Sequence, residues 1–473
     1  MQLKTLIEEI KKEVYNFQDV TISDIEFDSR KVKKGTLFIA VPGEKFDGHK
    51  FIDDARNRGA VAVVTERRVE TDLPQIVVPD TRKIMSILAR KLYGDFNELK
   101  KIGITGTNGK TTTAFLIHSI LNRARISTGL IGTIYYIGKE KTRAEKTTPE
   151  APDIYRLLNK FRNEGIHYVV MEVSSHALKL ERVETLKFDT VVFTNLSQDH
   201  LDFHQTIEDY KNSKLHIFDL LKDKGTAVVN MDDPIIKDIY RRPLKHIVTF
   251  GMNKNANFWA EVLDEDINGI TVQINHQGKK YELNSRLFGQ YNVYNILAAF
   301  TTAFLMNINP EIIAEGIRAV SRIPGRMEQV VENVFVDFAH TPDAIKNVLS
   351  SLRKYIKGKL YIVFGCGGDR DKEKRPKMGA VATELADFAI ITSDNPRSEP
   401  PKKIINDIIK GIKGNNYKVI EDRAEAICYA LKLKKKDDVV LVAGKGHEEY
   451  QILKDRTIPF RDAEVIVKCS VNL

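Results

Sequence analysis

The sequence predicts an α/β fold divided into three domains, and three observations lead to this prediction. The chain has 473 residues, more than one hydrophobic core usually organises. Short apolar runs rich in β-branched residues alternate with helical patterns, as parallel sheets covered by helices require. One glycine-rich stretch, "GITGTNGKTTT" at residues 103–113, lies between such a run and a helical pattern. We therefore expect parallel sheets, one of which holds a phosphate-binding loop.

The composition is typical of a globular protein, with 42% apolar and 29% charged residues. The N-terminal stretch "MQLKTLIEEIKKEVYNF" predicts an amphipathic helix rather than a signal peptide. No apolar run approaches the ~18 residues of a membrane span. The net charge of +9 is spread along the chain, which favours a solvated lysine-rich surface over a nucleic-acid site. A mild positive field also helps to gather a polyanionic small substrate.

The chain has three cysteines, Cys366, Cys428 and Cys469, which are far apart in the sequence. Their odd number and wide spacing disfavour both a disulfide framework and a zinc site. Such cysteine usage suits a reducing compartment. We therefore expect a cytoplasmic protein, and we expect it to be a monomer.

The first predicted domain spans residues 1–97. Strands are expected at "TLFIAV" (36–41), "AVAVVTE" (60–66) and "QIVVPD" (75–80), with a helix at "FIDDARNRG" (51–59). This alternation of strands and helices is that of a small parallel α/β unit.

The second predicted domain spans residues 98–322. A buried strand at "LKKIGIT" leads into the glycine-rich loop, and residues 111–124 have apolar positions at helical spacing. Later strands are expected at "HYVVMEVS" and "FDTVVFTNL". The domain ends where Pro324-Gly325 interrupts the pattern.

The third predicted domain spans residues 323–473 and has three apolar runs, "KLYIVFGCGG", "ADFAIITSDNP" and "DDVVLVAGKGHE". Each run ends in glycine or charged residues. In open α/β sheets, ligands bind beyond the carboxyl ends of the strands. This domain is therefore also expected to hold a binding site.

The glycine-rich loop predicts a nucleotide-phosphate site. Backbone N–H groups and a helix N-terminus hold phosphates in such loops, Lys110 would reach the β- and γ-phosphates, and the Thr111 hydroxyl would ligate Mg²⁺. The common pattern has Gly six positions before the Lys, where this chain has Ile104. The loop is therefore a shorter G-x-x-G-K-T form, and a coincidental match is the alternative.

Two further side chains at strand ends indicate a metal site. Glu172 follows an apolar strand, and His200 follows the next strand along the chain. A buried acid is costly unless it is paired or metal-bound. A salt bridge at the strand edge is the alternative for Glu172, and a helix cap or surface position is the alternative for His200.

The motifs together resemble the Mur ligase family. The resemblance rests on "TGTNGKTTT", "MEVSSHALKLERV", "TNLSQDHLDFH" and "YKNSKLHIF", with "GCGGDRDKEKRP", "SDNPRSEP" and "GKGHE" in the third domain. It runs from about residue 28 to the C-terminus. It implies a three-domain architecture with a central P-loop ATPase-like parallel sheet and a C-terminal Rossmann-like domain.

The resemblance also implies a reaction in peptidoglycan precursor synthesis. ATP phosphorylates the D-Glu side-chain carboxylate of UDP-N-acetylmuramoyl-L-alanyl-D-glutamate. The amine of meso-diaminopimelate then attacks the acyl phosphate, and phosphate leaves. Cations must cover the phosphates and the developing charge.

The resemblance assigns the catalytic and metal-binding roles. The catalytic set implied is Lys110, Glu172, His200 and Lys214, and the metal set implied is Thr111, Glu172, His200 and Lys214. Lys214 is expected to be carbamylated by CO₂, because an anion can lie beside Mg²⁺ where an ammonium is repelled. From the residues alone, Lys214 is an ordinary exposed lysine on a charged helix.

ATP contacts are implied along the phosphate loop and at later motifs. The set comprises Gly106, Thr107, Asn108, Gly109, Lys110, Thr111, Thr112, Asn292, Asn295, Arg326, Asp337 and His340. Helix capping is the alternative for the two asparagines of "GQYNVYNILAA". The chain has Phe338 where the family usually has Tyr, so the ring is kept and the hydroxyl is not.

The UDP-muramoyl-dipeptide is expected to contact two segments. In the first domain Ser29 would contact the nucleotide, with the Gly43–Lys45 turn near uracil. In the second domain the dipeptide would be held by the "KTTPE" motif and its neighbours, Thr147, Thr148, Ser174 and Arg182. The chain departs from many relatives at Lys146, where they have Asn, and at Leu180, where some have Gln.

The third domain is expected to bind the amino acid. Two guanidiniums and one acid on one sheet edge suit a zwitterion, because Arg binds carboxylates in bidentate fashion. Ordinary surface ion pairs are the alternative. The "DNPR" motif resembles that of relatives that use meso-diaminopimelate rather than lysine. The implied contacts are Arg370, Asp394, Asn395, Pro396, Arg397, Gly444 and Glu448.

Three other functions are weighed against this one. A lysine-adding ligase is disfavoured by "DNPR", and a folate-polyglutamate ligase by the UDP-type first domain. A P-loop switch or motor acting on nucleic acid predicts a basic stripe with interleaved aromatic residues, which the sequence lacks.

Overall fold

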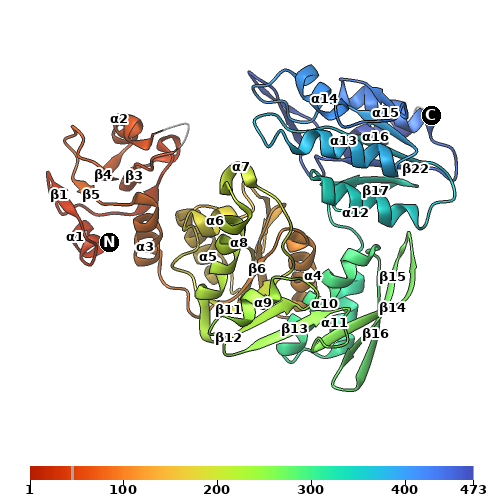
Figure 1. Cartoon of the computed structure of the whole chain (residues 1–473). Coiled ribbons are helices and arrows are strands. Elements are labelled where there is room, and N and C mark those ends of the chain that lie inside the picture. Colours follow the sequence, from red (N-terminus) through yellow and green to blue (C-terminus); the bar gives the residue numbers. More distant parts are fainter. Residues whose placement is uncertain (44–46, 472–473) are drawn as a thin grey trace.

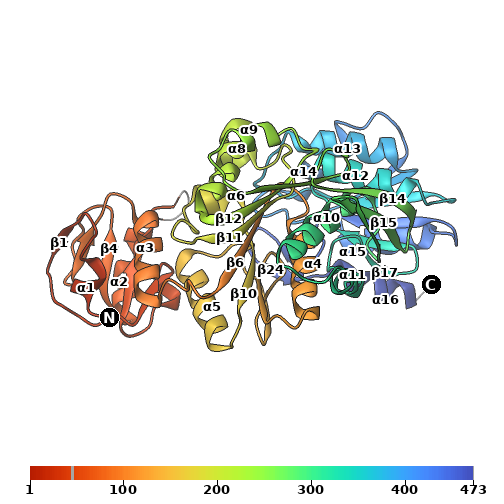
Figure 2. The same cartoon turned by 90° about the horizontal axis from the view of Figure 1, so that it is seen from below.

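The computed structural model describes residues 1–43 and 47–471 and has three α/β domains in chain order (Figure 1). Two views place the N-terminal domain at one end, with the middle domain between it and the C-terminal domain (Figures 1 and 2). No helix in the described part of the chain combines the length and apolar character that crossing a membrane requires.

The N-terminal domain is a five-stranded sheet of order β1-β5-β4-β3-β2. Its core is formed by apolar residues such as Leu37, Val64 and Ile76, all fully buried. Its elements are α1 (Leu3–Ile7), β1 (Glu13–Tyr15), β2 (Asp24–Glu26), η1 (Ser29–Lys31), β3 (Thr36–Ile39), η2 (Gly48–Phe51), α2 (Ile52–Asn57), β4 (Ala60–Thr65), β5 (Gln75–Val77) and α3 (Thr81–Tyr93).

The prediction of one amphipathic helix over the first 17 residues is wrong. Helix α1 ends at Ile7, and strand β1 pairs antiparallel with β5. Beyond the end of α1, the Lys12 ammonium donates to the carbonyl oxygen of Ile10 at 3.1 Å. Pairing with β5 supplies hydrogen-bonding partners for the backbone groups of Glu13–Tyr15. These residues therefore form a strand instead of continuing the helix.

The middle domain has an 11-stranded sheet of order β16-β15-β14-β13-β12-β11-β6-β10-β7-β8-β9. At its centre, β6 lies parallel between β10 and β11. Its elements are β6 (Lys100–Thr105), α4 (Lys110–Arg123), β7 (Thr128–Ile131), β8 (Tyr135–Ile137), β9 (Lys141–Arg143), α5 (Ala151–Asn163), β10 (Tyr168–Glu172), α6 (Ser175–Lys179), β11 (Phe188–Phe193), α7 (Leu201–His204), α8 (Ile207–Leu215), η3 (His216–Leu220), β12 (Leu221–Asn230), α9 (Ile236–Tyr240), β13 (Ile247–Gly251), β14 (Phe258–Asp266), β15 (Gly269–His276), β16 (Lys279–Ser285), α10 (Gln290–Leu305) and α11 (Pro310–Ala319).

Two apolar clusters flank the central strands of this sheet. Helices α4, α10 and α11 contribute to one of them, in which Ile117, Leu297 and Ile317 are fully buried. Helix α5 contributes to the other, which includes Leu158. Because both sheet faces are covered, β6, β10 and β11 are buried along most of their length. Their carboxyl ends meet at one edge, where the phosphate loop begins.

The C-terminal domain has a six-stranded sheet of order β17-β18-β22-β19-β20-β21, parallel except for β17. A separate two-stranded sheet pairs β23 with β24. The elements of the C-terminal domain are β17 (Glu328–Val331), β18 (Val334–Asp337), α12 (Pro342–Arg353), β19 (Leu360–Phe364), α13 (Lys374–Leu385), β20 (Phe388–Ile391), α14 (Pro401–Ile409), β21 (Tyr417–Val419), α15 (Arg423–Leu433), β22 (Val439–Ala443), β23 (Tyr450–Ile452), β24 (Thr457–Pro459) and α16 (Asp462–Val471).

The expectation that the cysteines do not form disulfides is wrong for one pair. Cys428 on α15 and Cys469 on α16 form a disulfide, with Cα atoms 5.5 Å apart. The two helices pack against each other, which brings cysteines 41 positions apart in sequence together. Spacing along the chain could not show this contact. Cys366 is free and buried.

Candidate active site

The phosphate loop joins β6 to α4 at the centre of the middle sheet. Gly106 and Gly109 both have positive φ angles, 143° and 86°. An added Cβ at Gly109 would lie 2.3 Å from Asn295 Oδ1, so only glycine fits there. Lys110 turns back over the loop and donates to the carbonyl oxygens of Gly106 and Thr107 at 2.8 and 2.9 Å. The loop thus presents an ammonium and a helix N-terminus at the same place, as phosphate binding requires.

Glu172 ends β10 beside this loop and is fully buried. Its Oε2 accepts hydrogen bonds from the hydroxyls of Thr111 at 2.8 Å and Thr133 at 2.9 Å. Its Oε1 accepts from the Thr133 backbone N–H at 2.8 Å. Within the described residues no lysine, arginine or histidine pairs with it, so the salt-bridge alternative does not hold there. Glu172 and Thr111 therefore form a buried set of oxygen donors.

Lys214 is buried with 1% of its surface exposed, so the alternative of an ordinary exposed lysine is wrong. Its Nζ donates to the Gly106 carbonyl oxygen at 2.8 Å, the oxygen that Lys110 also uses. The ring of Tyr210 lies 4.8 Å from the ammonium. Burial and the nearby charge of Lys110 hold the pKa of Lys214 well below its ordinary value.

His200 lies at the N-terminus of α7 with a left-handed φ of 54°. Its Nε2 lies 3.4 Å from Asp199 Oδ2, and its ring packs edge-on against His176 with centroids 4.7 Å apart. Burial lowers the pKa of His200 to about 3, although Asp199 opposes the shift. The imidazole is therefore neutral at neutral pH, the form that can ligate a metal.

The residues expected to hold the dipeptide surround Glu172. Thr147 Oγ1 lies 3.1 Å from Thr133 Oγ1, and Thr148 donates to the Glu172 carbonyl oxygen at 2.8 Å. Ser174 caps α6, and its N–H donates to Thr148 Oγ1 at 3.1 Å. Arg182 donates to the Thr148 carbonyl at 3.0 Å. The structure therefore brings this predicted set together, and its role in binding stays a prediction.

The departures from the family pattern have local partners here. Lys146 pairs with Glu150 at 3.0 Å, and Arg182 pairs with the same carboxylate at 2.8 Å. Lys146 therefore makes an ion pair within its own loop. Leu180 follows the last turn of α6 and donates its N–H to the His176 carbonyl.

The residues expected near UDP lie in the N-terminal domain, away from this site. Ser29 is buried in η1, and its hydroxyl bonds to Asp54. Ser29 does not line the cavity between the middle and C-terminal domains. The Gly43–Lys45 turn falls largely outside the described residues, so only Gly43 of it is placed.

The asparagines expected at the nucleotide lie one turn apart on α10. Asn295 Nδ2 donates to Asn292 Oδ1 at 2.9 Å, and Asn292 Nδ2 donates to the Phe288 carbonyl at 2.8 Å. Thr113 on α4 donates to Asn295 Oδ1 at 3.3 Å. Neither amide caps its own helix, because the cap residue is Gly289. Both asparagines line the cavity beside the phosphate loop.

Arg326 and its neighbours face the loop from the C-terminal domain. The guanidinium of Arg326 lies 4.6 Å from the Phe338 ring, so the ring that replaces the family's tyrosine supports this cation. Asp337 ends β18 and accepts N–H groups from Met327 at 2.7 Å and Ala339 at 2.8 Å. His340 donates through its Nδ1–H to the Phe338 carbonyl oxygen, 2.7 Å away.

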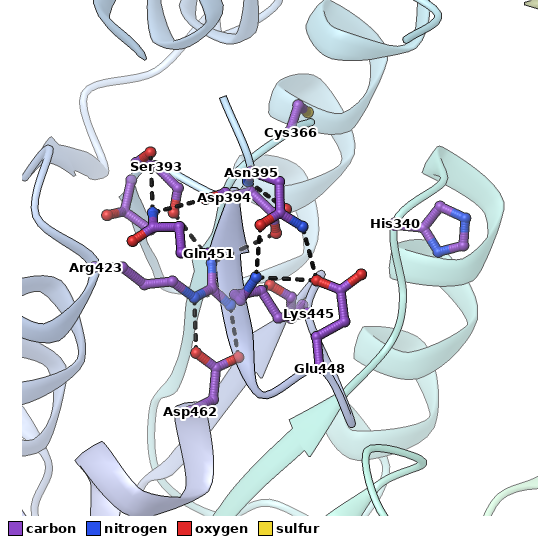
Figure 3. A network of polar contacts seen from close by, with 12 residues as sticks. His340, Cys366, Ser393, Asp394, Asn395, Arg423, Lys445, Glu448, Gln451 and Asp462 are labelled. Atoms are coloured by element: carbon purple, nitrogen blue, oxygen red, sulfur yellow. Dashed lines mark hydrogen bonds and ion pairs between the residues drawn. The ribbon is translucent and has the colours of Figure 1, made fainter. Parts of the chain in front are cut away.

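The predicted amino-acid residues follow β19, β20 and β22 of the C-terminal sheet. Arg397 has a left-handed φ of 52° and donates to the Gly368 carbonyl at 2.9 Å. Burial and the neighbouring Arg370 lower the pKa of Arg397. Asp394 and Asn395 are buried, and Asn395 Nδ2 donates to Glu448 Oε2 at 2.7 Å. Figure 3 shows Asp394, Asn395, Lys445 and Glu448 close together.

A cavity of about 540 Å³ between the middle and C-terminal domains brings the phosphate loop and the predicted amino-acid site together. It is lined by the phosphate loop, by Asn292 and Asn295, and by Arg326, Arg370, Arg397 and Glu448. Glu172 and Lys214 lie beneath its wall, whereas Pro396 does not line it. Residues that the sequence reasoning missed also line it: Thr133, His176, Asp199 and Lys374. Of these, Thr133 follows the end of β7, a position that a strand-end search could have found.

The fold and the site define a nucleotide-using enzyme in which a phosphate-binding domain and a second α/β domain share one cavity. Comparison with known proteins identifies the family. The Mur ligase family catalytic domain matches residues 21–93, the Mur ligase middle domain residues 104–303, and the Mur ligase glutamate ligase domain residues 325–446. The chain belongs to the Mur ligase family.

Individual relatives match over nearly the whole chain. A protein of Clostridium tetani named "UDP-N-acetylmuramoyl-L-alanyl-D-glutamate--2,6-diaminopimelate ligase" is 44% identical and covers 98% of each chain. One of Aquifex aeolicus with the same name is 45% identical over 94% of this chain and 93% of its own. A solved structure of a ligase with this name has a TM-score of 0.66 at 30% identity, and it covers 100% of this chain and 99% of its own.

Proposed function

We propose that this chain is an ATP-dependent ligase that joins meso-diaminopimelate to UDP-N-acetylmuramoyl-L-alanyl-D-glutamate in peptidoglycan precursor synthesis. Relatives over 40% identical along the full chain have this activity in their names. One observation supports it most: the phosphate loop and the arginines of the C-terminal domain line one cavity, and Glu172 lies beneath its wall, bonded to Thr111 of the loop. The substrates are ATP and a nucleotide-linked sugar, so we place the enzyme in the cytoplasm.

In the first step, an oxygen of the D-Glu side-chain carboxylate attacks the γ-phosphorus of ATP, and ADP leaves. Two anions approach each other here, so cations must reduce their repulsion. Lys110 and the N–H groups at the start of α4 bind the phosphates, and Arg326 faces them across the cavity. Lys110 then exchanges its carbonyl partners for phosphate oxygens, while Asn292 and Asn295 hold the nucleotide.

In the second step, the amine of the incoming amino acid attacks the acyl carbon. A tetrahedral intermediate forms, and its collapse expels phosphate and leaves an amide. Thr147, Thr148, Ser174 and Arg182 keep the dipeptide beside Glu172 during this step. The middle and C-terminal domains together exclude water, which would otherwise hydrolyse the acyl phosphate.

Magnesium fits the residues present at the loop. Thr111 Oγ1 and Glu172 Oε2 are hard oxygen donors 2.8 Å apart, and the buried carboxylate of Glu172 accepts hydrogen bonds from two threonine hydroxyls and one backbone N–H. When bound, Mg²⁺ supplies positive charge to the phosphate oxygens. Thr111 and Glu172 would hold the ion linked to ATP, and Glu172, His200 and a carbamate on Lys214 would hold a second one.

Carbamylation fits the environment of Lys214. Its buried amine has a lowered pKa, and a neutral amine is the form that adds CO₂. As an ammonium it shares the Gly106 carbonyl with Lys110, so two positive charges compete for one acceptor. A carbamate would replace this repulsion by attraction to Lys110 and to metal.

The choice of diaminopimelate over lysine follows from charge. Diaminopimelate has a second carboxylate, and Arg370 and Arg397 both line the cavity. Lysine leaves one guanidinium without an anion in a partly buried site. The predicted binding set also includes Asp394, Asn395, Pro396, Gly444 and Glu448.

The experiment that tests this function is phosphate release with ATP and UDP-N-acetylmuramoyl-L-alanyl-D-glutamate. We expect release to depend on meso-diaminopimelate and to be slow with lysine. Arg397→Asn should lower that preference by about 1.5–3 kcal/mol, the value of a charge-assisted hydrogen bond. Arg353→Asn, which removes a surface arginine paired with Asp387, is the matched control. Equal release with both amino acids, or turnover that needs nucleic acid instead, would contradict the proposal.

A further inference from the structure

A buried lysine that the mechanism above does not use lies behind the amino-acid site. Lys445 follows β22 in the "GKGHE" segment and is 0% exposed. Its Nζ donates to Asn395 Oδ1 at 3.0 Å and to Glu448 Oε2 at 2.9 Å. Asn395 Nδ2 donates to the same Glu448 oxygen at 2.7 Å, which closes a triangle of three side chains (Figure 3).

The triangle has one orientation that satisfies every donor. An ammonium only donates, so the oxygen of the Asn395 amide must face Lys445 and its nitrogen must face Glu448. The backbone N–H of Ile452 on β23 donates to the same Asn395 oxygen at 2.9 Å. Lys445 and β23 therefore set the direction of the amide, and the amide holds the carboxylate.

The two bonds leave Glu448 with a defined free side. Both end on Oε2, and Figure 3 shows the other carboxylate oxygen pointing away from Lys445 and Asn395, on the side of His340. Glu448 and His340 both line the shared cavity. Oε1 is thus the oxygen that can meet an ammonium of a ligand.

Arg397 and Arg370 line the same cavity as Glu448. A carboxylate that is free to rotate beside two guanidiniums pairs with one of them, because opposite charges attract strongly at a partly buried site. Such a pair would occupy both the acid that receives the substrate ammonium and the arginine that receives its carboxylate. The bonds to Lys445 and Asn395 oppose that rotation.

We propose that Lys445 is a positioning residue for the amino-acid substrate: it holds Glu448 so that Oε1 receives the substrate ammonium and Arg397 stays free for its carboxylate. The inference rests on the proposed function, and it adds the residue that keeps the two recognition charges apart. Lys445 acts on the substrate only through Glu448, to which its Nζ donates at 2.9 Å.

The test compares Lys445→Met with Glu448→Gln in the full-length enzyme, by steady-state phosphate release. We expect Lys445→Met to raise the KM for meso-diaminopimelate about tenfold or more, since charge-assisted bonds are lost. The KM values for ATP and for the UDP-muramoyl-dipeptide should change less than about twofold, because those substrates bind elsewhere. The double variant should be no worse than Glu448→Gln alone, because Lys445 acts through Glu448.

The matched control is Lys101→Met, which removes another buried lysine. Lys101 is 2% exposed and donates to the Phe96 and Leu99 carbonyls at 2.6 and 3.0 Å, far from the amino-acid site. It should lower the melting temperature without a selective effect on diaminopimelate. Lys445→Gln, which keeps an N–H donor on a side chain one atom shorter, serves if Lys445→Met does not fold, and it should give a smaller increase in the same KM.

The outcomes separate this inference from the proposed function. If the wild-type enzyme does not release phosphate with diaminopimelate, the function itself is wrong. If the wild type is active and the lysine variants leave the KM for diaminopimelate unchanged, the positioning role is overturned. Additive effects in the double variant, or equal increases in all three KM values, would also overturn it.

Discussion

At the residue scale, the site depends on a few buried charges with unusual neighbours. Lys110 and Lys214 share the Gly106 carbonyl, and among the described residues Glu172 accepts from hydroxyl and amide groups only. Without bound ligands, the two ammoniums and the carboxylate are held by neutral groups and not by opposite charges. Phosphates, metal and a carbamate would supply the missing partners, so the residues are arranged for a bound state.

The first prediction concerns Lys214. Lys214→Ala should lower the turnover rate by about 10²–10³, the cost of removing one group that stabilises charge in a catalytic site. Small carboxylates such as acetate should restore part of the rate by replacing the carbamate. Lys211→Ala, on the same helix and paired with Glu208 at 2.9 Å, is the control and should keep its rate. Full activity of Lys214→Ala without added carboxylate would show that no carbamate is needed.

Much of the residue-level site could be predicted, because its members follow strand ends. Glu172, His200 and Arg397 were located in this way, and their roles stay predictions. The burial of Lys214 could not be predicted, since a charged helical sequence is the same whether its lysine meets solvent or a carbonyl. The disulfide between Cys428 and Cys469 depends on how α15 and α16 pack, which sequence spacing does not show.

At the scale of elements, the phosphate loop and helix α8 place the reacting groups. The loop has two glycines at positive φ, and α8 brings Lys214 against it from another part of the chain. Both arrangements depend on local backbone geometry. They can therefore be tested by changing one glycine and one helix-end residue.

The second prediction concerns the backbone of the loop. Gly109→Ala places a methyl group 2.3 Å from Asn295 Oδ1, at a φ of 86°. Gly165 has a similar φ of 75°, and an added Cβ there meets nothing within 4 Å. Gly165→Ala should therefore cost only the backbone strain, about 1–2 kcal/mol. Gly109→Ala should cost more in thermal unfolding and should raise the KM for ATP; equal effects of the two variants would contradict the close approach.

The third prediction concerns pH and the end of α8. His216 lies at this end and contacts Glu184 at 2.7 Å and Asp219 at 2.9 Å. Mainly through its bond to Glu184, its pKa rises from 6.5 to about 9. Because the folded-state pKa is the higher one, its stabilisation is complete below about pH 6.5 and is lost as the pH rises through about 9.

His216→Gln should therefore lower the melting temperature at pH 6 and have little effect at pH 9.5. His246→Gln, which replaces an exposed histidine, is the control and should have no such pH dependence. Melting curves of both variants across this range make the comparison. A constant difference between wild type and His216→Gln at all pH values would contradict the assigned ion pairs.

Strands were the elements that could be predicted best. The apolar runs of β3, β4, β6, β10, β11, β19, β20 and β22 were all expected as strands, because buried parallel strands are almost purely apolar. The antiparallel strands β14, β15 and β16 were not expected, since their alternation is partly obscured by charged residues such as Asp264 and Glu265. The N-terminal helix was predicted too long because polar residues after Ile7 fit a helix pattern equally well.

At the scale of the whole molecule, two groups of contacts join the domains. Arg156 on α5 contacts Asp24 at 3.1 Å and Glu26 at 2.5 Å in the N-terminal domain. Arg143 on β9 pairs with Glu449 and donates to the His447 carbonyl at 3.1 Å in the C-terminal domain. The second contact ties the hairpin before the "KTTPE" motif to the segment that bears Glu448.

The fourth prediction concerns this second contact. Arg143→Gln should raise the KM for diaminopimelate by up to about fivefold, since exposed ion pairs are worth at most about 1 kcal/mol. The KM for ATP should hardly change. Lys141→Gln removes a charge from the same strand, where the Lys141 ammonium lies over the Tyr135 ring of its own domain, and it is the control. An effect of equal size in both variants would show that the strand's charge, not the contact, matters.

The number and type of domains could be predicted, because each has its own run of strands and helices. The predicted boundaries at residues 97 and 322 fall between sheets, in the segments after α3 and after α11. The relative placement of the domains could not be predicted, since it depends on side-chain pairs such as Arg143 with Glu449. No local pattern in the sequence indicates which partner such an arginine finds.

The measurement that tests the central claim most directly follows one oxygen atom. The dipeptide substrate is prepared with heavy oxygen in the D-Glu side-chain carboxylate, and the released phosphate is analysed by mass. If ATP activates this carboxylate for attack by the amine, the bridging oxygen leaves with phosphorus, and one labelled oxygen appears in phosphate for each amide formed. Amide formation with unlabelled phosphate would contradict the account.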